Sequence, residues 1–194
     1  MLVKFNYLNY SLKYSNINLV KKLIYHFGGI SLSENKIQWI TRTAILLAVA
    51  LVFQLGGFPQ PISGPVVNTV LYLAAMIVGM SSGIVIGIFT PLVAFMTGIM
   101  GFPPMIPFIA AGNALLVIVF VLLKKYHHIL GIVAASFFKF ILLAASIRLL
   151  ANFFLENVPE PIIQAMSLPQ LFTALAGGVL ALIVYKALEA VEFI

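Results

Sequence analysis

Lys139 is the side chain with the clearest chemical potential, because it is a cation inside an otherwise apolar stretch. It lies about 17 Å into a predicted helix at 128–155, with Ser136 on the same face. The carboxylates all fall outside the predicted membrane spans: Glu34, Glu156, Glu160, Glu189 and Glu192. A cation at that depth is costly unless it snorkels, meets backbone carbonyls or binds an anionic ligand. We therefore expect Lys139 to contact a substrate that carries a carboxylate or a carbonyl.

Side-chain amides form a second group of candidate binding residues. Gln54 closes the first predicted helix, Asn68 opens the second, and Asn113 lies about 9 Å into the fourth. Amides without partners are costly in hydrocarbon, so they must face one another, a water-filled cavity or a ligand. Two interpretations are open: an outward-opening substrate pocket that also includes Ser136 and Lys139, or hydrogen bonds that only join helices. Taken together, the residues favour a pocket.

The composition predicts that membrane helices position these side chains. Of 194 residues, 62% are hydrophobic and 8% are charged, and the mean hydropathy is +1.13. Such a chain has too little polar surface for a water-soluble globule. The pattern predicts an all-α polytopic membrane protein, a bundle of six transmembrane helices at 39–55, 65–79, 83–100, 107–124, 128–155 and 169–188. Pro65, Pro107 and Pro169 each stand at a predicted helix start.

The basic residues predict how the bundle is oriented. One side of the predicted bundle carries Lys4, Lys13, Lys21, Lys22, Lys36, Arg42, Lys124, Lys125 and Lys186. Arg148 alone lies near the other side, where it would snorkel to lipid headgroups or pair with Glu156. The positive-inside rule then places both termini in the cytoplasm and the protein in the cell membrane.

Three regions follow from this pattern: a cytoplasmic N-terminal extension at 1–38, a six-helix substrate-binding domain at 39–188 and a cytoplasmic tail at 189–194. The extension is rich in Asn, Tyr, Ser and Lys. Within it, residues 17–27 alternate apolar and basic side chains, which is typical of a helix lying on anionic lipid. An unordered tail is the other interpretation.

Small residues recur at a spacing that lets helices touch. Gly79, Gly83 and Gly87 repeat every fourth residue, and we expect them to serve packing within the bundle. Ala44 and Ala48 have the same spacing in the first helix. They fit either internal packing or a flat strip that binds a partner helix.

Several other functions lack the residues that they need. The chain has no Cys, and His26, His127 and His128 all fall on the predicted cytoplasmic side. We therefore predict no catalytic residue, no metal site, no cofactor and no enzymatic activity. Nucleic-acid binding is not expected, because the positive-inside rule already accounts for the basic residues. The chain also lacks a phosphate-binding GxxxxGK[ST] loop and acids within its spans, so we expect any driving force to come from elsewhere.

The segment ITRTAILLAVALVF, Ile40 to Phe53, resembles the first helix of the substrate-binding S components of energy-coupling factor (ECF) vitamin transporters. The glycine-flanked helix pair of Gly64 to Ile99 and the Gly-Asn pair in PFIAAGNALLV, Pro107 to Val117, are also similar to members of that family. The resemblance extends over about residues 38–187, and the long N-terminal extension departs from it.

This resemblance implies a protein that captures a vitamin or related micronutrient from outside the cell. Delivery would occur in a complex with a transmembrane coupling subunit and two ATPases. Ala44 and Ala48 would contact the coupling subunit. By position, the substrate-binding residues would be Gln54, Asn68, Asn113 and Lys139. The alternative is an accessory or structural membrane subunit with no small-molecule ligand, in which the same polar side chains only connect helices.

Overall fold

The computed structural model describes residues 34–154 and 158–191. The predicted lipid-surface helix at 17–27 and the predicted partner of Arg148, Glu156, lie outside these residues. Contacts divide the chain after Gln38, and residues 39–194 form one compact unit, to which the description below refers. Arg148 is exposed, and its guanidinium donates a hydrogen bond to the Ala144 carbonyl at 3.4 Å.

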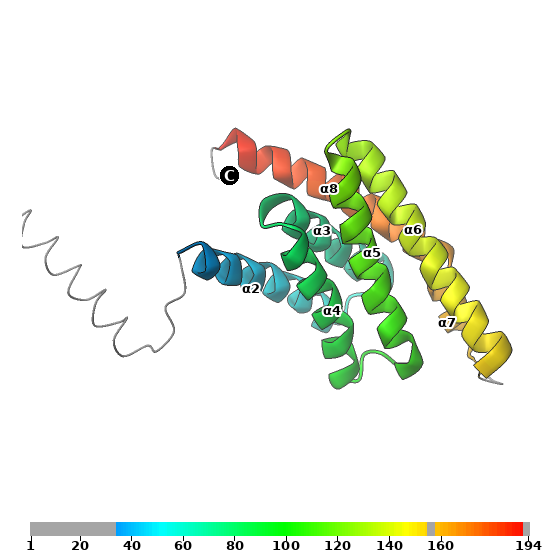
Figure 1. The fold of residues 1–194 in the computed structure, drawn as a ribbon. Helices are drawn as coiled ribbons and strands as arrows, with labels where there is room; N and C mark the ends of the chain where they lie inside the picture. The colour runs from blue at the N-terminus through cyan, green and yellow to red at the C-terminus, as the bar shows by residue number, and fades with distance from the viewer. Residues whose placement is uncertain (1–33, 155–157, 192–194) are drawn as a thin grey trace, which may run out of the picture. The chain divides into compact units, whose positions relative to one another are not determined.

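Helices account for nearly all of the described chain, and it contains no strand, which confirms the all-α prediction for residues 34–154 and 158–191. The long helices are α2 (Glu34–Leu55), α3 (Gln60–Ile77), α4 (Met80–Met96), α5 (Ile106–Lys124), α6 (His128–Leu149) and α8 (Leu168–Ala190). The short ones are the 3₁₀ turn η1 (Pro103–Met105), the π-helical turn η2 (Leu150–Phe154) that continues α6, and α7 (Glu160–Ala165). Figure 1 shows their order along the chain.

Three helices begin several residues earlier than predicted, namely α2, α3 and α4. Helix α3 begins at Gln60 and not at residue 65, because Pro61 fits the first turn, where no N–H partner is required. Pro65 therefore lies inside α3 and does not begin it. Helix α4 begins at Met80 and not at residue 83, directly after Gly79, whose φ of 127° is a conformation that favours glycine.

Helix ends and connections also differ from the prediction. Helix α4 ends at Met96 and not at residue 100, because the chain turns at Gly98 with a φ of 75°. Helix α2 begins five residues earlier than expected, at Glu34. The connection predicted at 156–168 contains α7, which was not anticipated. Pro107 and Pro169 do lie in the first turns of α5 and α8, as predicted.

Four segments are long and apolar enough to cross a membrane: Asn35–Leu55, Pro103–Lys124, His128–Asn152 and Glu160–Ala190. Helix α4 is a shorter apolar helix. Helix α3 is neither a candidate span nor a short apolar helix, because polar and proline residues occupy its first half, from Gln60 to Thr69. The described chain is thus a polytopic, membrane-type helical protein with four evident spans where the sequence predicted six.

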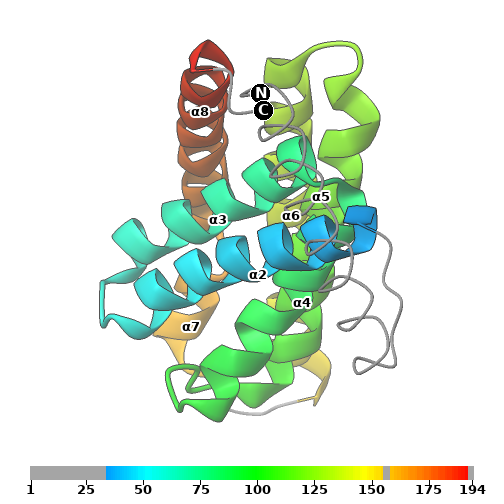
Figure 2. The same ribbon diagram turned by 90° about the vertical axis from the view of Figure 1, so that its left-hand side faces the viewer.

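Glycines bring α3 against α8 and α4 against α5. In Figure 2, α3 runs across the upright α8, and a Cβ on Gly177 of α8 would lie 2.6 Å from the Asn68 Cβ and 2.7 Å from the Pro65 carbonyl oxygen. Gly83 and Gly87 of α4 are buried against α5, so their predicted role in internal packing is confirmed. Such close approach is possible only where a side chain is missing. For Gly79 the packing prediction is wrong, because a Cβ there would meet no atom within 4 Å and the residue instead makes the turn before α4.

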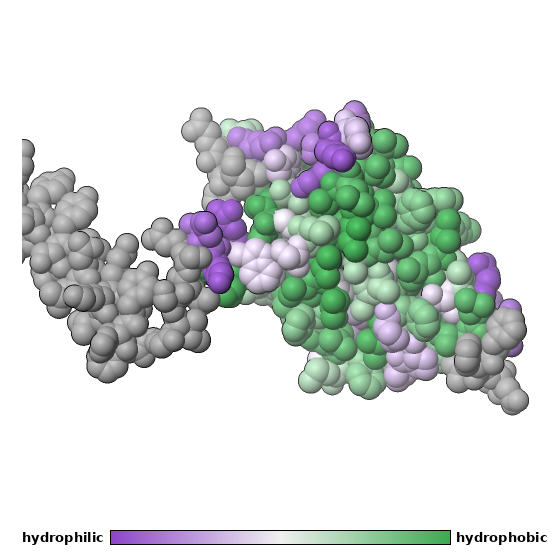
Figure 3. Space-filling view, in the orientation of Figure 1, coloured by the Kyte–Doolittle hydropathy of each residue, from purple (hydrophilic) through white to green (hydrophobic). Residues whose placement is uncertain are grey.

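The surface is apolar over the helices and polar at their ends. In Figure 3 a broad green area covers α4, α5 and α6, and purple residues gather beyond it at the upper left and at the lower right. Lys124, Lys125 and Lys186 lie at the C-terminal ends of α5 and α8. An apolar belt between polar ends is the surface that a bilayer requires.

Candidate functional site

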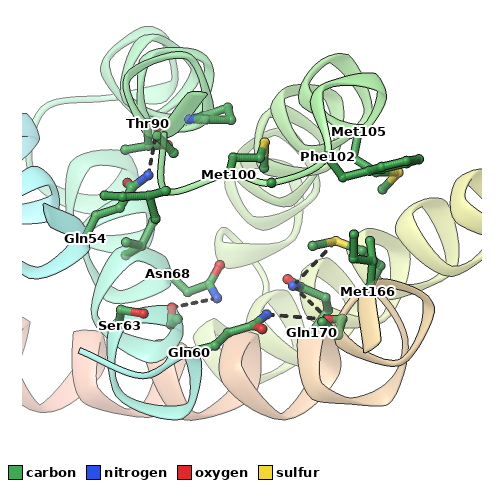
Figure 4. A pocket seen from close by; sticks show the side chains of 18 of the residues that line it. Gln54, Gln60, Ser63, Asn68, Thr90, Met100, Phe102, Met105, Met166 and Gln170 are labelled. Atoms are coloured by element: carbon green, nitrogen blue, oxygen red, sulfur yellow. Dashed lines mark hydrogen bonds between the residues drawn. The ribbon is translucent and has the colours of Figure 1, made fainter. Parts of the chain in front are cut away.

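A cavity of about 430 Å³ opens among the helix ends that lie away from Lys124, Lys125 and Lys186. Its walls come from the C-terminal ends of α2 and α4, the N-terminal halves of α3 and α8, the connection at 99–105, and α7. Figure 4 draws the side chains of most of the residues that line it. This volume lies in the range of small-molecule binding sites.

Lys139 reaches this cavity from the middle of α6, although the residue as a whole is only 3% exposed. Its ammonium donates hydrogen bonds to Asn68 Oδ1 at 2.6 Å and to Asn113 Oδ1 at 2.8 Å. The sequence left snorkelling, backbone carbonyls and an anionic ligand as ways to stabilise this cation. The structure adds another, because two side-chain amides from α3 and α5 hold the ammonium in place.

The two asparagines are themselves fixed by backbone carbonyls. Pro91 has no N–H, so the Gly87 carbonyl one turn earlier in α4 lacks its helical partner. Asn113 Nδ2 donates to this carbonyl at 3.0 Å, which leaves Asn113 Oδ1 for Lys139. Asn68 Nδ2 donates to the Gly64 carbonyl at 3.0 Å with the same effect.

A glycine of a neighbouring helix backs each asparagine. A Cβ on Gly87 would lie 2.8 Å from the Asn113 Cβ, and a Cβ on Gly177 would lie 2.6 Å from the Asn68 Cβ. Neither asparagine can shift toward the neighbouring helix, so their oxygens meet the ammonium in one defined arrangement. The lysine is thereby pre-organised before any ligand binds.

Gln54 and Thr90 form a second polar part of the wall. Gln54 Nε2 donates to the Thr90 carbonyl at 3.0 Å and so joins α2 to α4. Gln54 Oε1 and Thr90 Oγ1 are buried and have no hydrogen-bond partner among the residues that the structure describes. Unpaired buried polar atoms are rare and call for a ligand or a water molecule as explanation. Figure 4 shows both side chains at the cavity.

The rest of the wall is mostly apolar. Thioethers and aromatic rings make up much of it: Phe58, Met100, Phe102, Met105 and Met166. Gln60 and Gln170 both donate to the Ala165 carbonyl of α7, at 3.4 and 3.2 Å, and so attach α7 to the starts of α3 and α8. Short polar anchors within an apolar wall suit an amphipathic small molecule.

The family model for the substrate-specific component of ECF transporters matches residues 38–189. The chain belongs to this family. No curated protein and no solved structure matched the chain. Substrate-specific components bind small molecules and work with a coupling subunit and ATPases, so the protein is a transporter component of the membrane and not an enzyme.

The structure of this substrate-specific component places the predicted substrate-binding residues at different depths. Gln54, Asn68 and Lys139 line the cavity. Asn113 lies behind the lysine and contacts its ammonium without lining the cavity. Ser136 is fully buried away from the cavity, with its hydroxyl 2.9 Å from the Tyr72 hydroxyl.

Other residues at the site were not among the predicted substrate contacts, notably Thr90, Gln60 and Gln170. Thr90 precedes Pro91 in an apolar helix. In the sequence, only that proline indicated that the backbone next to Thr90 is irregular. The predicted partner strip lies elsewhere: Ala44 and Ala48 are exposed on α2. No group of three His, Asp or Glu side chains that could hold a metal is found in residues 34–154 and 158–191.

Proposed function

We propose that this S component captures a vitamin or related micronutrient from outside the cell for ATP-driven uptake. A transmembrane coupling subunit and two ATPases, all separate chains, would supply the energy. In this proposal the chain crosses the membrane six times, with α3 and α4 as short crossings and both termini in the cytoplasm. Residues 1–38 and 189–194 would be the cytoplasmic extension and tail that flank the substrate-binding domain.

The observation that carries the proposal is a cavity lined by a buried, pre-organised cation. Polar residues that only join helices would satisfy one another and leave packed side chains between them. Thr43 and Ser82 do so elsewhere in the bundle, where their hydroxyls are 2.8 Å apart and buried. Lys139, in contrast, lines about 430 Å³ of space next to Gln54 and Thr90, which have unpaired atoms.

The orientation in the proposal rests on charge. Lys124, Lys125 and Lys186 lie at the helix ends away from the cavity. Cytoplasmic flanks of membrane helices carry an excess of Lys and Arg, so the positive-inside rule puts the cavity on the outer side. A substrate would then enter directly from outside.

Partner binding in the proposal rests on α2. Only 11% of the residues in its most apolar stretch are buried, and Ala44 and Ala48 both lie on its exposed surface. Small side chains at a four-residue spacing let a second helix approach closely. We assign this strip to the coupling subunit.

The proposal is tested by purifying the protein from membranes in mild detergent, denaturing it and identifying the released small molecules by mass spectrometry. We expect one molecule at close to one equivalent per chain from wild type, and a large reduction in Lys139→Met. Repeated absence of any such molecule from wild type, together with unchanged uptake in cells lacking the protein, would favour the accessory-subunit alternative.

A further inference from the structure

The positive charge at the cavity faces no carboxylate among the residues that the structure describes. Both acceptors of the Lys139 ammonium, Asn68 Oδ1 and Asn113 Oδ1, are neutral amide oxygens. No Asp or Glu is among the described residues that line the cavity. Amide oxygens stabilise an ammonium by hydrogen bonding, but they do not cancel its charge in a low-dielectric site. An anion bound in the cavity would balance that charge.

The ammonium also retains donor capacity. A lysine ammonium has three N–H donors, and the two asparagines account for two of them. Because Lys139 lines the cavity, the third N–H is available to a group bound there. A carboxylate oxygen would accept this hydrogen bond and balance the charge at once.

Gln54 and Thr90 require a hydrogen-bond donor from the ligand, whereas Lys139 requires an acceptor. Gln54 Oε1 can only accept a hydrogen bond, and Thr90 Oγ1 can accept one. Both atoms lack a partner in the described part of the chain. Gln54 is half-buried and lines the cavity, so a ligand N–H or O–H would satisfy its oxygen once the side chain rotates toward the ligand.

We infer that the substrate is a compact monoanion. One carboxylate meets Lys139, an apolar body contacts the methionine and phenylalanine side chains of the wall, and at least one N–H or O–H reaches the Gln54 and Thr90 pair. This inference rests on the proposed function and narrows it, because it excludes cationic substrates and neutral substrates that offer only a carbonyl.

The first test uses the small molecule that co-purifies with wild-type protein. Its charge and functional groups are assigned from accurate mass and fragmentation. The recovered molecule and its primary carboxamide, which has nearly the same shape but no charge, are then titrated into ligand-free protein. A hydrogen bond between charged groups contributes more than a neutral one, so we expect the carboxamide to bind roughly tenfold to a hundredfold more weakly.

The second test changes the charge balance without removing the lysine. Asn68→Asp retains an oxygen for the ammonium but adds the missing negative charge, and Gly64 O keeps its helical backbone partner. We expect this variant to bind the recovered molecule at least about tenfold more weakly, while the affinity of the carboxamide changes less than roughly threefold. A thermal unfolding midpoint near that of wild type establishes that Asn68→Asp is folded.

The outcomes separate this inference from the proposed function. A stoichiometric molecule that is neutral or cationic, or a carboxamide that binds as tightly as the carboxylate, overturns the inference and leaves capture intact. Equal losses of both probes in Asn68→Asp also overturn it, since the effect would then not depend on ligand charge. Absence of any bound molecule overturns the proposed function and the inference with it.

Discussion

Thr90→Val should stabilise the empty protein and weaken substrate binding, a combination that a purely structural threonine cannot produce. Thr90 is 2% exposed, and its hydroxyl has no partner among the described residues. Valine has almost the same shape and a similar helix propensity, so the substitution isolates the hydroxyl. Removing an unpaired buried polar group should gain about 1 kcal/mol.

For a chain of this size, that free energy corresponds to a rise of about 2–4 °C in the thermal unfolding midpoint. The assay is thermal unfolding of ligand-free protein in detergent, followed by titration with the co-purified molecule. If that molecule hydrogen-bonds to Thr90, the loss of one neutral hydrogen bond should weaken binding roughly threefold to tenfold.

Thr43→Val is the matched control. The Thr43 hydroxyl donates to Ser82 Oγ at 2.8 Å, and both residues are buried. The same chemical change therefore leaves Ser82 unpaired and should lower the midpoint by about 2–4 °C, with little effect on binding. Equal destabilisation by Thr43→Val and Thr90→Val would refute the reasoning, because the Thr90 hydroxyl would then have a partner in the empty protein.

Two further predictions concern packing and assembly. Gly87→Ala should lower stability by about 1–3 kcal/mol, measured by thermal unfolding, because its Cβ would lie 2.8 Å from the Asn113 Cβ. It should weaken ligand binding as well. An unchanged midpoint would mean that α4 and α5 separate easily there. Ala44→Leu combined with Ala48→Leu should abolish co-purification with the coupling subunit and leave ligand binding intact, whereas Ala145→Leu, on an exposed part of α6, should preserve the complex. Survival of the complex in the double variant would show that the contact strip lies elsewhere.

The location of the site could be predicted because depth in a membrane helix follows from position in the sequence. The sequence predicts Gln54 and Asn68 near helix ends on one side of the bundle and Lys139 near the middle of its helix, and the structure brings all three to one cavity. How far the cavity extends along a helix is harder to predict. Ser136 shares a face with Lys139 but lies three residues closer to the start of α6, where its hydroxyl contacts that of Tyr72 on α3 and does not reach the cavity.

Backbone irregularities account for what the sequence did not predict. A proline inside a helix frees a carbonyl, but periodicity does not tell which neighbour will bond to it. Pro91 frees the Gly87 carbonyl, and Asn113 of another helix is its partner. Helix α7 has six residues, which is too few for a periodic pattern, so its part in the cavity wall emerged only from the fold.

Native mass spectrometry of the intact protein released from membranes tests most directly whether the cavity holds a small molecule. Wild type should carry one adduct of a single defined mass. Ala165→Trp, which fills part of the cavity from α7, should lose that adduct, and Ala187→Trp, on an exposed part of α8 away from the cavity, should retain it. An adduct of equal occupancy in wild type and Ala165→Trp, or no adduct in wild type, would contradict the account.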